Sequence, residues 1–353
     1  MVHTHQSLSA QWKNLRQSMG IEKFRRTLRI LPTHFGHGLI YDWRLARLSG
    51  QNLLILPPFK PKLVTQRSSL LDSHEITCMS SVPPIWRFAL KMARPPQKGL
   101  LQRMLCGSAP LSAHLWKGIQ KWTGTQEVIN AYGITETASW VAGSTMVDLT
   151  PEDGLIGIPW GAAIKIIKSH SPKVPPSMAQ ECAAGEAGHV LLNTPALMKG
   201  YLGRDDLTHQ VVAQGWFYTG DVGLLDDCGI FFLRGRQREE INKGGAKVYP
   251  GDIDFLLEQH KQILDVCTFG YEDPLLGEDV GVAVVVKSAS DGDFRELYGW
   301  LRKRLSKQQM PQRWYVLDRI PRSSRGKINR SMVAQVCSGL VSVDHLKIVR
   351  SGN

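Results

Sequence analysis

The stretch at residues 215–250 constrains the fold most, because turn signals, an apolar run and a charge cluster follow one another closely in it. It reads GWFYTGDVGLLDDCGIFFLRGRQREEINKGGAKVYP. Asp226 and Asp227 precede Gly229 and an apolar run, a pattern typical of a tight β-hairpin. The dense charges at 234–240 stand where a sheet would otherwise continue. The sequence therefore predicts a hairpin followed by a charged segment.

Two features of this stretch suit a nucleotide. The carboxylate of Asp221 can accept hydrogen bonds from two ribose hydroxyls, and the guanidinium of Arg236 follows a short way along the chain. Two adjacent glycines, Gly244 and Gly245, lie between lysines and predict a flexible basic loop suited to phosphates. A hairpin with a solvated charged turn is the alternative interpretation of the same residues.

A chain of 353 residues is long enough for about two domains with ample core. Its 42% hydrophobic and 21% charged residues are typical of a soluble globular protein, and we find no apolar run of transmembrane length and no secretory signal. The six cysteines are scattered without a CxxC pair, which argues against a disulfide framework or a zinc site. We therefore expect a protein of a reducing compartment, the cytoplasm.

The net charge of +12 would suit binding to nucleic acid or to a membrane surface. The basic residues are dispersed, however, and the sequence holds no combined aromatic and basic platform of the RNA-binding type. An enzyme that handles polyanionic small molecules can also use a positive surface. We therefore expect no nucleic-acid partner and no transmembrane segment.

Apolar strands alternate with amphipathic helices in the first part of the chain. Helices are predicted at 6–26, 63–71, 84–93 and 112–122, and strands at 28–31, 53–56, 76–79, 101–106 and 127–129. This βαβα order favours a parallel sheet flanked by helices, and the strand at 53–56 is expected to be buried. Short β units follow residue 147. Beyond residue 234 the pattern predicts helices at 252–260 and 293–307 and strands at 263–271 and 280–286.

Four sequence blocks occur in a fixed order. They are GSAPL at 107–111, NAYGITE at 130–136, TGD at 219–221 followed by GRxxxxxxxGGxxxxPxxID from 235, and PRSSRGK at 321–327. Together they resemble the signature of the adenylate-forming enzymes, which include acyl- and aryl-CoA synthetases, luciferase and peptide-synthetase adenylation domains. The resemblance covers nearly all of the chain.

This resemblance implies an α/β fold in two domains. Residues 1–233 would form a partial large AMP-binding domain with a mostly parallel sheet, and about 145–233 of it would be a small β-barrel subdomain. Residues 234–340 would form the small α+β C-terminal domain, and 341–353 a tail.

The NAYGITE block carries residue types that suit a magnesium nucleotide. Tyr132 offers a flat face for adenine and Asn130 a partner for the adenine edge, while Gly133 permits a bend. Thr135 can hydrogen-bond a phosphate oxygen, and Glu136 is a hard oxygen ligand for Mg²⁺. The resemblance implies nucleotide binding by Gly107, Ser108, Ala109, Asn130, Tyr132, Gly133, Asp221 and Arg236.

The resemblance also implies a catalytic set. The set consists of Lys327, Thr135 and Glu136. Lys327 would contact the reacting carboxylate and the α-phosphate, and Glu136 would also hold the metal. Arg238 falls at the family's hinge, where Lys or Asp is usual. The small domain would rotate at this residue between the two steps of the reaction.

Further residues are placed by the same motifs. Gly244 and Gly245 would approach the channel for the pantetheine arm of CoA. The segment at 31–38 resembles the family's LPxxHxxG turn, and Phe35 takes the aromatic or His position there. His34 and His37 are displaced from that position, so we expect them to be structural rather than catalytic.

The implied function is an ATP-dependent acyl- or aryl-CoA ligase, which is an AMP-forming acid–thiol ligase of the kind used in fatty acid metabolism. Its ligands would be a carboxylic acid, ATP or AMP, Mg²⁺ and CoA. Two alternatives remain open. One is an enzyme that loads the phosphopantetheine of a carrier protein, and the other is a non-catalytic remnant or binding subunit of such an enzyme.

The string HTHQSL at 3–8 bears on how much of the family's machinery is present. In the family a similar string directly follows a Gly/Ser/Thr-rich phosphate loop, and this sequence contains no such loop. We therefore expect that the chain lacks the N-terminal portion of the large domain and is impaired in ATP use on its own. A separately encoded N-terminal segment is a candidate partner.

Overall fold

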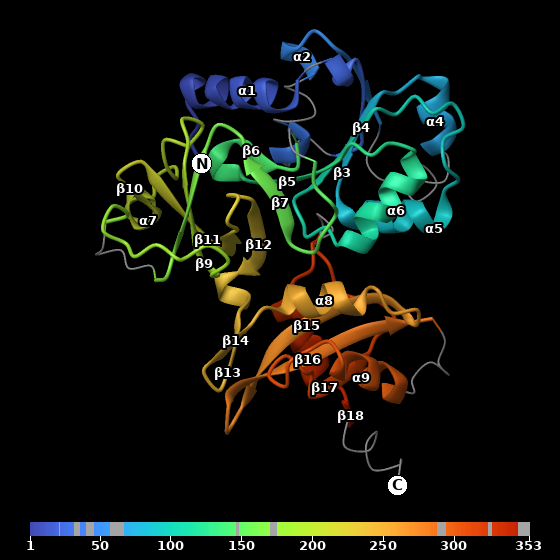
Figure 1. Ribbon diagram of the computed structural model, residues 1–353, viewed down its shortest axis with the longest axis vertical. Coiled ribbons are helices and arrows are strands. Elements are labelled where there is room, and N and C mark those ends of the chain that lie inside the picture. The colour runs from blue at the N-terminus through green and yellow to red at the C-terminus, as the bar shows by residue number, and fades with distance from the viewer. Residues whose placement is uncertain are drawn as a thin grey trace. The chain divides into compact units, whose positions relative to one another are not determined.

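The computed structural model describes residues 1–20, 22–31, 36–39, 46–56, 67–145, 148–169, 175–287, 294–323 and 327–344. The chain divides into two compact units, Met1–Leu233 and Arg234–Asn353 (Figure 1). His34 and Phe35, on which the sequence placed a turn, lie outside the described residues, as does most of the predicted tail.

Five short strands form the parallel part of the large sheet in the first unit, in the order β2-β1-β3-β4-β5. They are β1 (Arg26–Arg29), β2 (Asn52–Ile55), β3 (Cys78–Ser81), β4 (Arg103–Gly107) and β5 (Val128–Ile134). Each pairing along this order is parallel, which confirms the fold class that the βαβα order predicts. The expectation that residues 53–56 are buried was wrong, because β2 is the edge strand and its residues are exposed or half-buried.

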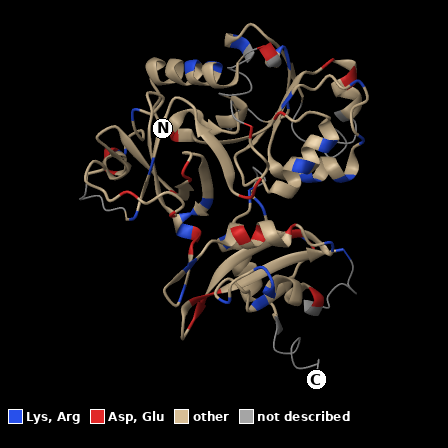
Figure 2. Ribbon diagram, viewed as in Figure 1, with Lys and Arg blue, Asp and Glu red and all other residues tan. Residues whose placement is uncertain are grey.

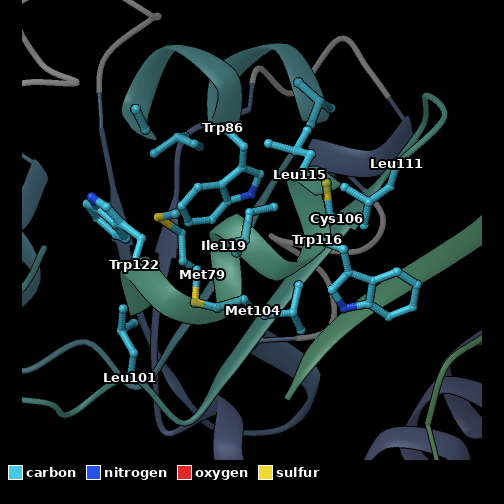
Figure 3. Packing of buried hydrophobic residues seen from close by; sticks show 14 of the residues in the cluster. Met79, Trp86, Leu101, Met104, Cys106, Leu111, Leu115, Trp116, Ile119 and Trp122 are labelled. Carbon is cyan, nitrogen blue, oxygen red and sulfur yellow. The ribbon is translucent and has the colours of Figure 1, made fainter. Parts of the chain in front are cut away.

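Side chains on these strands alternate between the two faces of the sheet. Met104 packs with α5 (Pro83–Met92) and α6 (Ala113–Thr123), whereas its neighbour Leu105 packs with α1 (His5–Met19). This period of two follows from strand geometry. Figure 3 shows the hydrophobic cluster that Met104 forms with α5 and α6, with the Trp86 ring in its middle.

The first helix is shorter than the sequence pattern suggests. Thr4 caps the N-terminus of α1 through a reciprocal pair of hydrogen bonds with Ser7. Gly20 ends the helix with φ of +66°, a conformation that favours glycine, and a 3₁₀ turn at Glu22–Phe24 leads into β1. The helix predicted at 6–26 therefore stops at Met19.

Antiparallel strands continue the same sheet, in the order β5-β6-β7-β12-β11-β9-β8, with β10 paired to β11. They are β6 (Ser139–Gly143), β7 (Leu155–Pro159), β8 (Ala163–Ile167), β9 (Gly188–Asn193), β10 (Val212–Ala213), β11 (Trp216–Leu225) and β12 (Phe231–Arg236). The strand β6 pairs with both β5 and β7, so the parallel and antiparallel parts are continuous. Most of these strands lie within residues 145–233, and the β-barrel subdomain that the resemblance implies there stays a prediction.

Short elements complete the first unit. They are α2 (Ala46–Leu48), α4 (Arg67–Ser73), α7 (Asp205–Val211) and the 3₁₀ turn η3 (Thr135–Thr137). The turn η3 directly follows β5 and contains the end of the NAYGITE block.

The second unit is a six-stranded sheet with helices against it. Its strands run in the order β14-β13-β16-β17-β18, and β15 pairs with β16. The strands are β13 (Ile241–Lys243), β14 (Ala246–Val248), β15 (Ile263–Asp273), β16 (Gly277–Val286), β17 (Arg313–Val316) and β18 (Val343–Asp344). The helices are α8 (Pro250–Leu257), α9 (Phe294–Arg302) and α10 (Arg330–Ser338), and η4 (Gln237–Glu239) is a 3₁₀ turn. Val282 packs on one face with α8 and α9, while Ala283 packs on the other with α10.

The charged residues and the cysteines are distributed as follows. Lysine and arginine are interspersed with aspartate and glutamate along the chain (Figure 2). All six cysteines are free thiols. Within the described ranges, every helix falls short of the length and apolar character that a bilayer span requires.

Replacing Trp86 by alanine should destabilise the first unit strongly. The Trp86 side chain is fully buried and packs edge-on against Trp122 with ring centroids 5.7 Å apart. Removing such a ring leaves a cavity and should lower the free energy of unfolding by about 3–5 kcal/mol. Urea titration measures the loss, and Leu202→Ala is the control because Leu202 is 80% exposed. A Trp86→Ala protein as stable as that control would contradict the prediction.

Candidate functional site

The GSAPL block begins at the carboxyl end of β4, the edge where open α/β sheets bind their ligands. A Cβ on Gly107 would lie 2.8 Å from the carbonyl oxygen of Ala131, so only glycine allows the close approach of β4 to β5. Ser108 follows with φ of +66°, which is rare for a residue with a side chain. The chain therefore turns sharply out of the sheet at Ser108, and Ala109 after it is half-buried.

A buried histidine supports this turn. His37 Nδ1 lies 3.0 Å from the hydroxyl oxygen of Ser108, and its Nε2 lies 2.5 Å from the hydroxyl oxygen of Ser80. The ring also packs edge-on against Trp140, with centroids 4.5 Å apart. These contacts suit the structural role that the sequence suggests for His37.

The strand β5 carries the first half of the NAYGITE block. Asn130 is buried, and its side-chain amide donates to the carbonyl oxygen of Leu155 at 2.7 Å. The protein thus uses one of the two amide hydrogens that were predicted to serve the adenine edge. At the next positions the register between β5 and β6 shifts, and a Cβ on Gly133 would lie 2.3 Å from the carbonyl oxygen of Ser139. The bend predicted at Gly133 is therefore a strand irregularity where only glycine fits.

A second irregularity, in β11, brings Asp221 to Tyr132. The register between β11 and β9 shifts between Tyr218 and Val222, and Gly220 within this interval has φ of +69°. Such a bulge redirects a side chain that would otherwise continue the alternation of the strand. The Tyr132 hydroxyl donates to Asp221 Oδ2 at 2.5 Å, across 89 positions of sequence. The structure therefore joins the NAYGITE and TGD blocks into one site.

Both partners of this hydrogen bond are buried, with exposed fractions of 2% for Asp221 and 6% for Tyr132. The backbone N–H of Asp221 donates to Thr219 Oγ1 at 2.9 Å, and the Tyr132 ring packs edge-on against Phe231. Burial, and next the charge of Asp221, raise the pKa of the Tyr218 hydroxyl. A carboxylate in such a buried position requires hydrogen-bond donors.

The turn η3 presents Thr135 and Glu136 directly after β5. Glu136 Oε1 accepts a hydrogen bond from the Tyr201 hydroxyl at 2.9 Å, and its carbonyl oxygen accepts from the N–H of Met198 at 2.7 Å. Burial, together with the hydrogen bond to Glu136 and its charge, raises the pKa of Tyr201, so the hydroxyl keeps its proton and donates. Tyr201 was not among the residues that the sequence predicted for the site.

Residues at the N-terminus contact the turn η3 and the segment beside it. Val2 forms an antiparallel bridge with Gly200, one residue before Tyr201. His3 Nε2 donates to the carbonyl oxygen of Thr135 at 2.9 Å. Three segments that are far apart in sequence therefore meet at η3, and the HTH string contributes to the site through His3.

The remaining predicted residues lie in the second unit. Arg236 is the last residue of β12, Arg238 lies within η4, and both are exposed. Lys327 is also exposed, beside an antiparallel bridge between Arg322 and Ile328. The roles of Arg236, Arg238 and Lys327 stay predictions from the sequence blocks.

Gly244 and Gly245 form the two-residue turn between β13 and β14. Their φ values are +59° and +88°, and positive φ at both positions is typical of a type I′ hairpin. The N–H of Gly244 donates to the carbonyl oxygen of Leu276 at 2.9 Å, which ties the turn to the neighbouring strands. The two glycines therefore make a tight hairpin.

The lysines beside these glycines are paired within the protein. Lys243 Nζ lies 2.5 Å from Asp279 Oδ1, and the two side chains are only 10% and 7% exposed. Lys247 Nζ lies 3.3 Å from Glu240 Oε1. The segment is therefore a tight hairpin rather than the flexible loop that the sequence predicted. Lys243 is committed to Asp279, whereas the Lys247 side chain is 58% exposed, and the suitability of the segment for phosphates stays a prediction.

Fold and sequence blocks together define an α/β protein in which GSAPL and the end of NAYGITE stand at the carboxyl ends of the neighbouring parallel strands β4 and β5. The chain matches the family model of the AMP-binding enzymes over residues 1–202, more than half of its length. It also matches the AMP-binding enzyme C-terminal domain over residues 252–327. The protein belongs to the AMP-binding, adenylate-forming enzymes, which confirms the resemblance of its four sequence blocks.

Individual relatives agree with this assignment. The chain is 28% identical over 311 residues to a long-chain-fatty-acid–CoA ligase of Bacillus subtilis (strain 168), covering 88% of this chain and 54% of that protein. It is 29% identical over 341 residues to a feruloyl-CoA synthase of Amycolatopsis sp, covering 94% of this chain and 65% of that protein. The chain thus spans less than two thirds of the length of either relative.

A solved structure extends the comparison. The o-succinylbenzoate coenzyme A synthetase (MenE) of Bacillus subtilis, in complex with ATP and a magnesium ion, superposes with a TM-score of 0.78 at 25% sequence identity. The match covers 94% of this chain and 66% of that one. The fold class predicted from the sequence is therefore the fold of adenylate-forming enzymes.

Removing the Tyr132 hydroxyl should destabilise the first unit. Tyr132→Phe deprives the buried Asp221 carboxylate of this donor, and an unsatisfied buried acceptor costs about 1–3 kcal/mol. Tyr218→Phe is the matched control, because the Tyr218 hydroxyl makes a longer contact, 3.3 Å, with His189 Nδ1. Urea titration compares the two variants. A loss of stability in Tyr132→Phe no greater than in the control would show that Asp221 does not depend on Tyr132.

Proposed function

We propose that the chain is an ATP-dependent acyl- or aryl-CoA ligase that forms an acyl-adenylate and then a thioester. The observation that carries this proposal is the buried hydrogen bond between Tyr132 and Asp221, which joins the two blocks suited to adenosine. The names of the relatives support the CoA ligase chemistry, with fatty acids and aromatic acids as the candidate substrate classes.

Adenosine would bind along the carboxyl edge of the sheet. Gly107, Ser108 and Ala109 have small or no side chains, so the adenine ring could lie against their backbone, and Tyr132 would supply an aromatic face. A carboxylate has room for about four hydrogen bonds, so the bond from Tyr132 leaves Asp221 able to accept from ribose hydroxyls. Arg236 would add a second contact to the ribose.

Glu136 is the proposed ligand of Mg²⁺. In the described part of the chain, no three metal-binding side chains gather to form a site by themselves. This fits Mg²⁺, which keeps several waters and binds through one or two carboxylates together with nucleotide phosphates. The bound ion would neutralise charge on the phosphates, while Tyr201 orients the Glu136 carboxylate and Thr135 donates to a phosphate oxygen.

The proposed reaction has two steps. In the first, a carboxylate oxygen of the substrate attacks the α-phosphorus of ATP and pyrophosphate leaves, while Lys327 places positive charge beside the reacting groups. In the second, the thiol sulfur of CoA attacks the acyl carbon, the thiol loses its proton and AMP leaves. Arg238 would be the hinge between these steps, and the hairpin at Gly244 and Gly245 would border the path of the pantetheine arm.

Use of ATP by this chain alone should be slow. Binding the β- and γ-phosphates needs several N–H donors and a nearby positive charge. The sequence contains no Gly/Ser/Thr-rich loop for them, and Thr135, Glu136 and Lys327 serve the α-phosphate and the metal. The thioester step from a supplied acyl-adenylate does not need that loop. A separately encoded segment that carries it would restore ATP use.

Two alternatives predict different outcomes. Loading of a carrier protein uses the same residues and the same two steps, and differs only in the thiol that accepts the acyl group. A non-catalytic binding subunit would retain AMP binding and show neither step.

The test measures AMP binding and the two steps separately. Asp221→Ala should weaken AMP binding at least tenfold by calorimetry, because it removes the ribose acceptor. The unaltered chain should form thioester from synthetic acyl-AMP and CoA. It should exchange pyrophosphate far below the median enzyme turnover of about 10 per second. Lys327→Ala should lower the exchange about a hundredfold further, as loss of one transition-state donor does, and should spare the thioester step.

Controls and contrary outcomes are as follows. Lys261→Ala removes a lysine that is 71% exposed in the second unit and should change neither step. Equal AMP affinity in the unaltered chain and in Asp221→Ala would remove the basis of the site. Binding of AMP without either step would favour the non-catalytic alternative, and pyrophosphate exchange near 10 per second would show that the absent loop is not needed.

Tyr201→Phe should weaken the magnesium-dependent part of nucleotide binding. The Tyr201 hydroxyl orients the carboxylate of Glu136, and loss of a group that orients a metal ligand typically costs 10- to 100-fold in affinity. Calorimetry with ATP and Mg²⁺ should therefore show at least a tenfold loss. The control is ATP with a chelator, which should bind equally to both proteins; a loss of the same size there would contradict a role through the metal.

A further inference from the structure

Two arginines, one before and one after Lys327 in the sequence, form ion pairs within the second unit. Before Lys327, Arg322 Nη2 lies 2.7 and 2.8 Å from the two carboxylate oxygens of Asp265 in β15. Arg322 also bridges to Ile328, and the N–H of Ser323 donates to the carbonyl oxygen of Lys327 at 2.8 Å. The backbone of Lys327 is thus fixed to β15 from one side.

On the other side stands Arg330, the first residue of α10. Its Nη1 donates to Asp254 Oδ2 at 2.6 Å and to the carbonyl oxygen of Thr268 at 2.7 Å. Its Nε donates to Glu239 Oε2 at 3.1 Å. The Arg330 side chain is only 14% exposed, so a single buried guanidinium connects α10, α8, β15 and η4.

The inner part of this network serves the core of the second unit. Asp254 is 6% exposed, and its Oδ1 also accepts from the N–H of Thr268 at 2.6 Å. Burial raises the pKa of the Asp254 carboxyl, and the adjacent Arg330 opposes that rise. A buried ion pair that loses one partner leaves an uncompensated charge, so replacing Arg330 itself would disturb folding.

The outer contact has a different character. The side chain of Glu239 is 30% exposed, and Glu239 belongs to η4, the turn that contains Arg238. Arg330 keeps Asp254 and the Thr268 carbonyl as partners without it, so the core does not require Glu239. The contact does join the residues beside the proposed hinge to the residues beside Lys327.

We propose that Arg330, through Glu239, is a positioning residue that ties the turn after Arg238 to the backbone around Lys327. Because of this link, the backbone around Lys327 moves together with the turn η4 when the backbone rotates at Arg238. This inference rests on the proposed function only for the roles of Arg238 and Lys327. The link between the two segments is a property of the second unit by itself.

The test breaks the outer contact and leaves the inner one. In Glu239→Ala, amide hydrogen exchange at Lys327 and Ile328 should accelerate at least fivefold, while amides of β16 keep their rates. Glu239→Gln retains an acceptor oxygen for Nε and should restore most of the protection. Glu296→Ala is the matched control, because it removes a carboxylate that is 62% exposed and pairs with Lys261 at the surface.

Two outcomes would overturn the proposal. One is exchange at Lys327 and Ile328 that does not change in Glu239→Ala, and the other is an equal acceleration throughout β16, which would mean general loosening. A second measurement separates the proposed function: a non-hydrolysable acyl-adenylate mimic should protect Lys327 from acetylation about fivefold in the unaltered chain and less than twofold in Glu239→Ala. Absence of protection in the unaltered chain counts against the role of Lys327, whereas the exchange rates decide on the link.

Discussion

A buried carboxylate requires hydrogen-bond donors. In the candidate site the Tyr132 hydroxyl is a donor to the buried carboxylate of Asp221. The bond forms because two strands lose their regular register, β5 beside Gly133 and β11 around Gly220. At Gly133 a side chain would collide with the backbone of β6, and at Gly220 the backbone is left-handed. Each of the two glycines therefore gives its strand an irregular shape, and these shapes bring the side chains of Tyr132 and Asp221 together.

The sequence predicted the family and the fold class because both rest on local order: motifs in a fixed succession and alternating strands and helices. It failed where the outcome depends on position in the sheet. Residues 53–56 have the composition of a buried strand, yet β2 is the edge strand of the sheet and stays half-exposed. The first helix was predicted too long because it was extended beyond Met19, the last of its regularly spaced apolar residues, whereas Gly20 adopts a positive φ and ends the helix.

The same distinction explains the site. Residues on sequence blocks could be predicted, but Tyr201 and His3 act through contacts with Glu136 and Thr135 that span 65 and 132 positions. The proximity of His3 and Tyr201 to η3 could have been suspected only from the fold. The prediction of a flexible loop at Gly244 and Gly245 was also wrong. The two glycines suggested flexibility, whereas the ion pair between Lys243 and Asp279 joins residues that are 36 positions apart in sequence, so it could not be inferred from the neighbouring residues.

The net charge of +12 can now be divided according to burial. Arg330 and Lys243 are largely buried and Arg322 is partly buried; all three pair with carboxylates, and these charges hold the second unit together and are unavailable to a polyanion. Arg236, Arg238 and Lys327 are exposed, and the sequence blocks predict them for the ribose, the hinge and the reacting groups respectively. A lysine that binds a phosphate needs an exposed ammonium group on a flexible side chain. The position of that group then depends on how firmly contacts of other residues fix the lysine backbone. Buried arginines suit that task because a planar guanidinium can hold several acceptors at once, as Arg330 does beside Lys327.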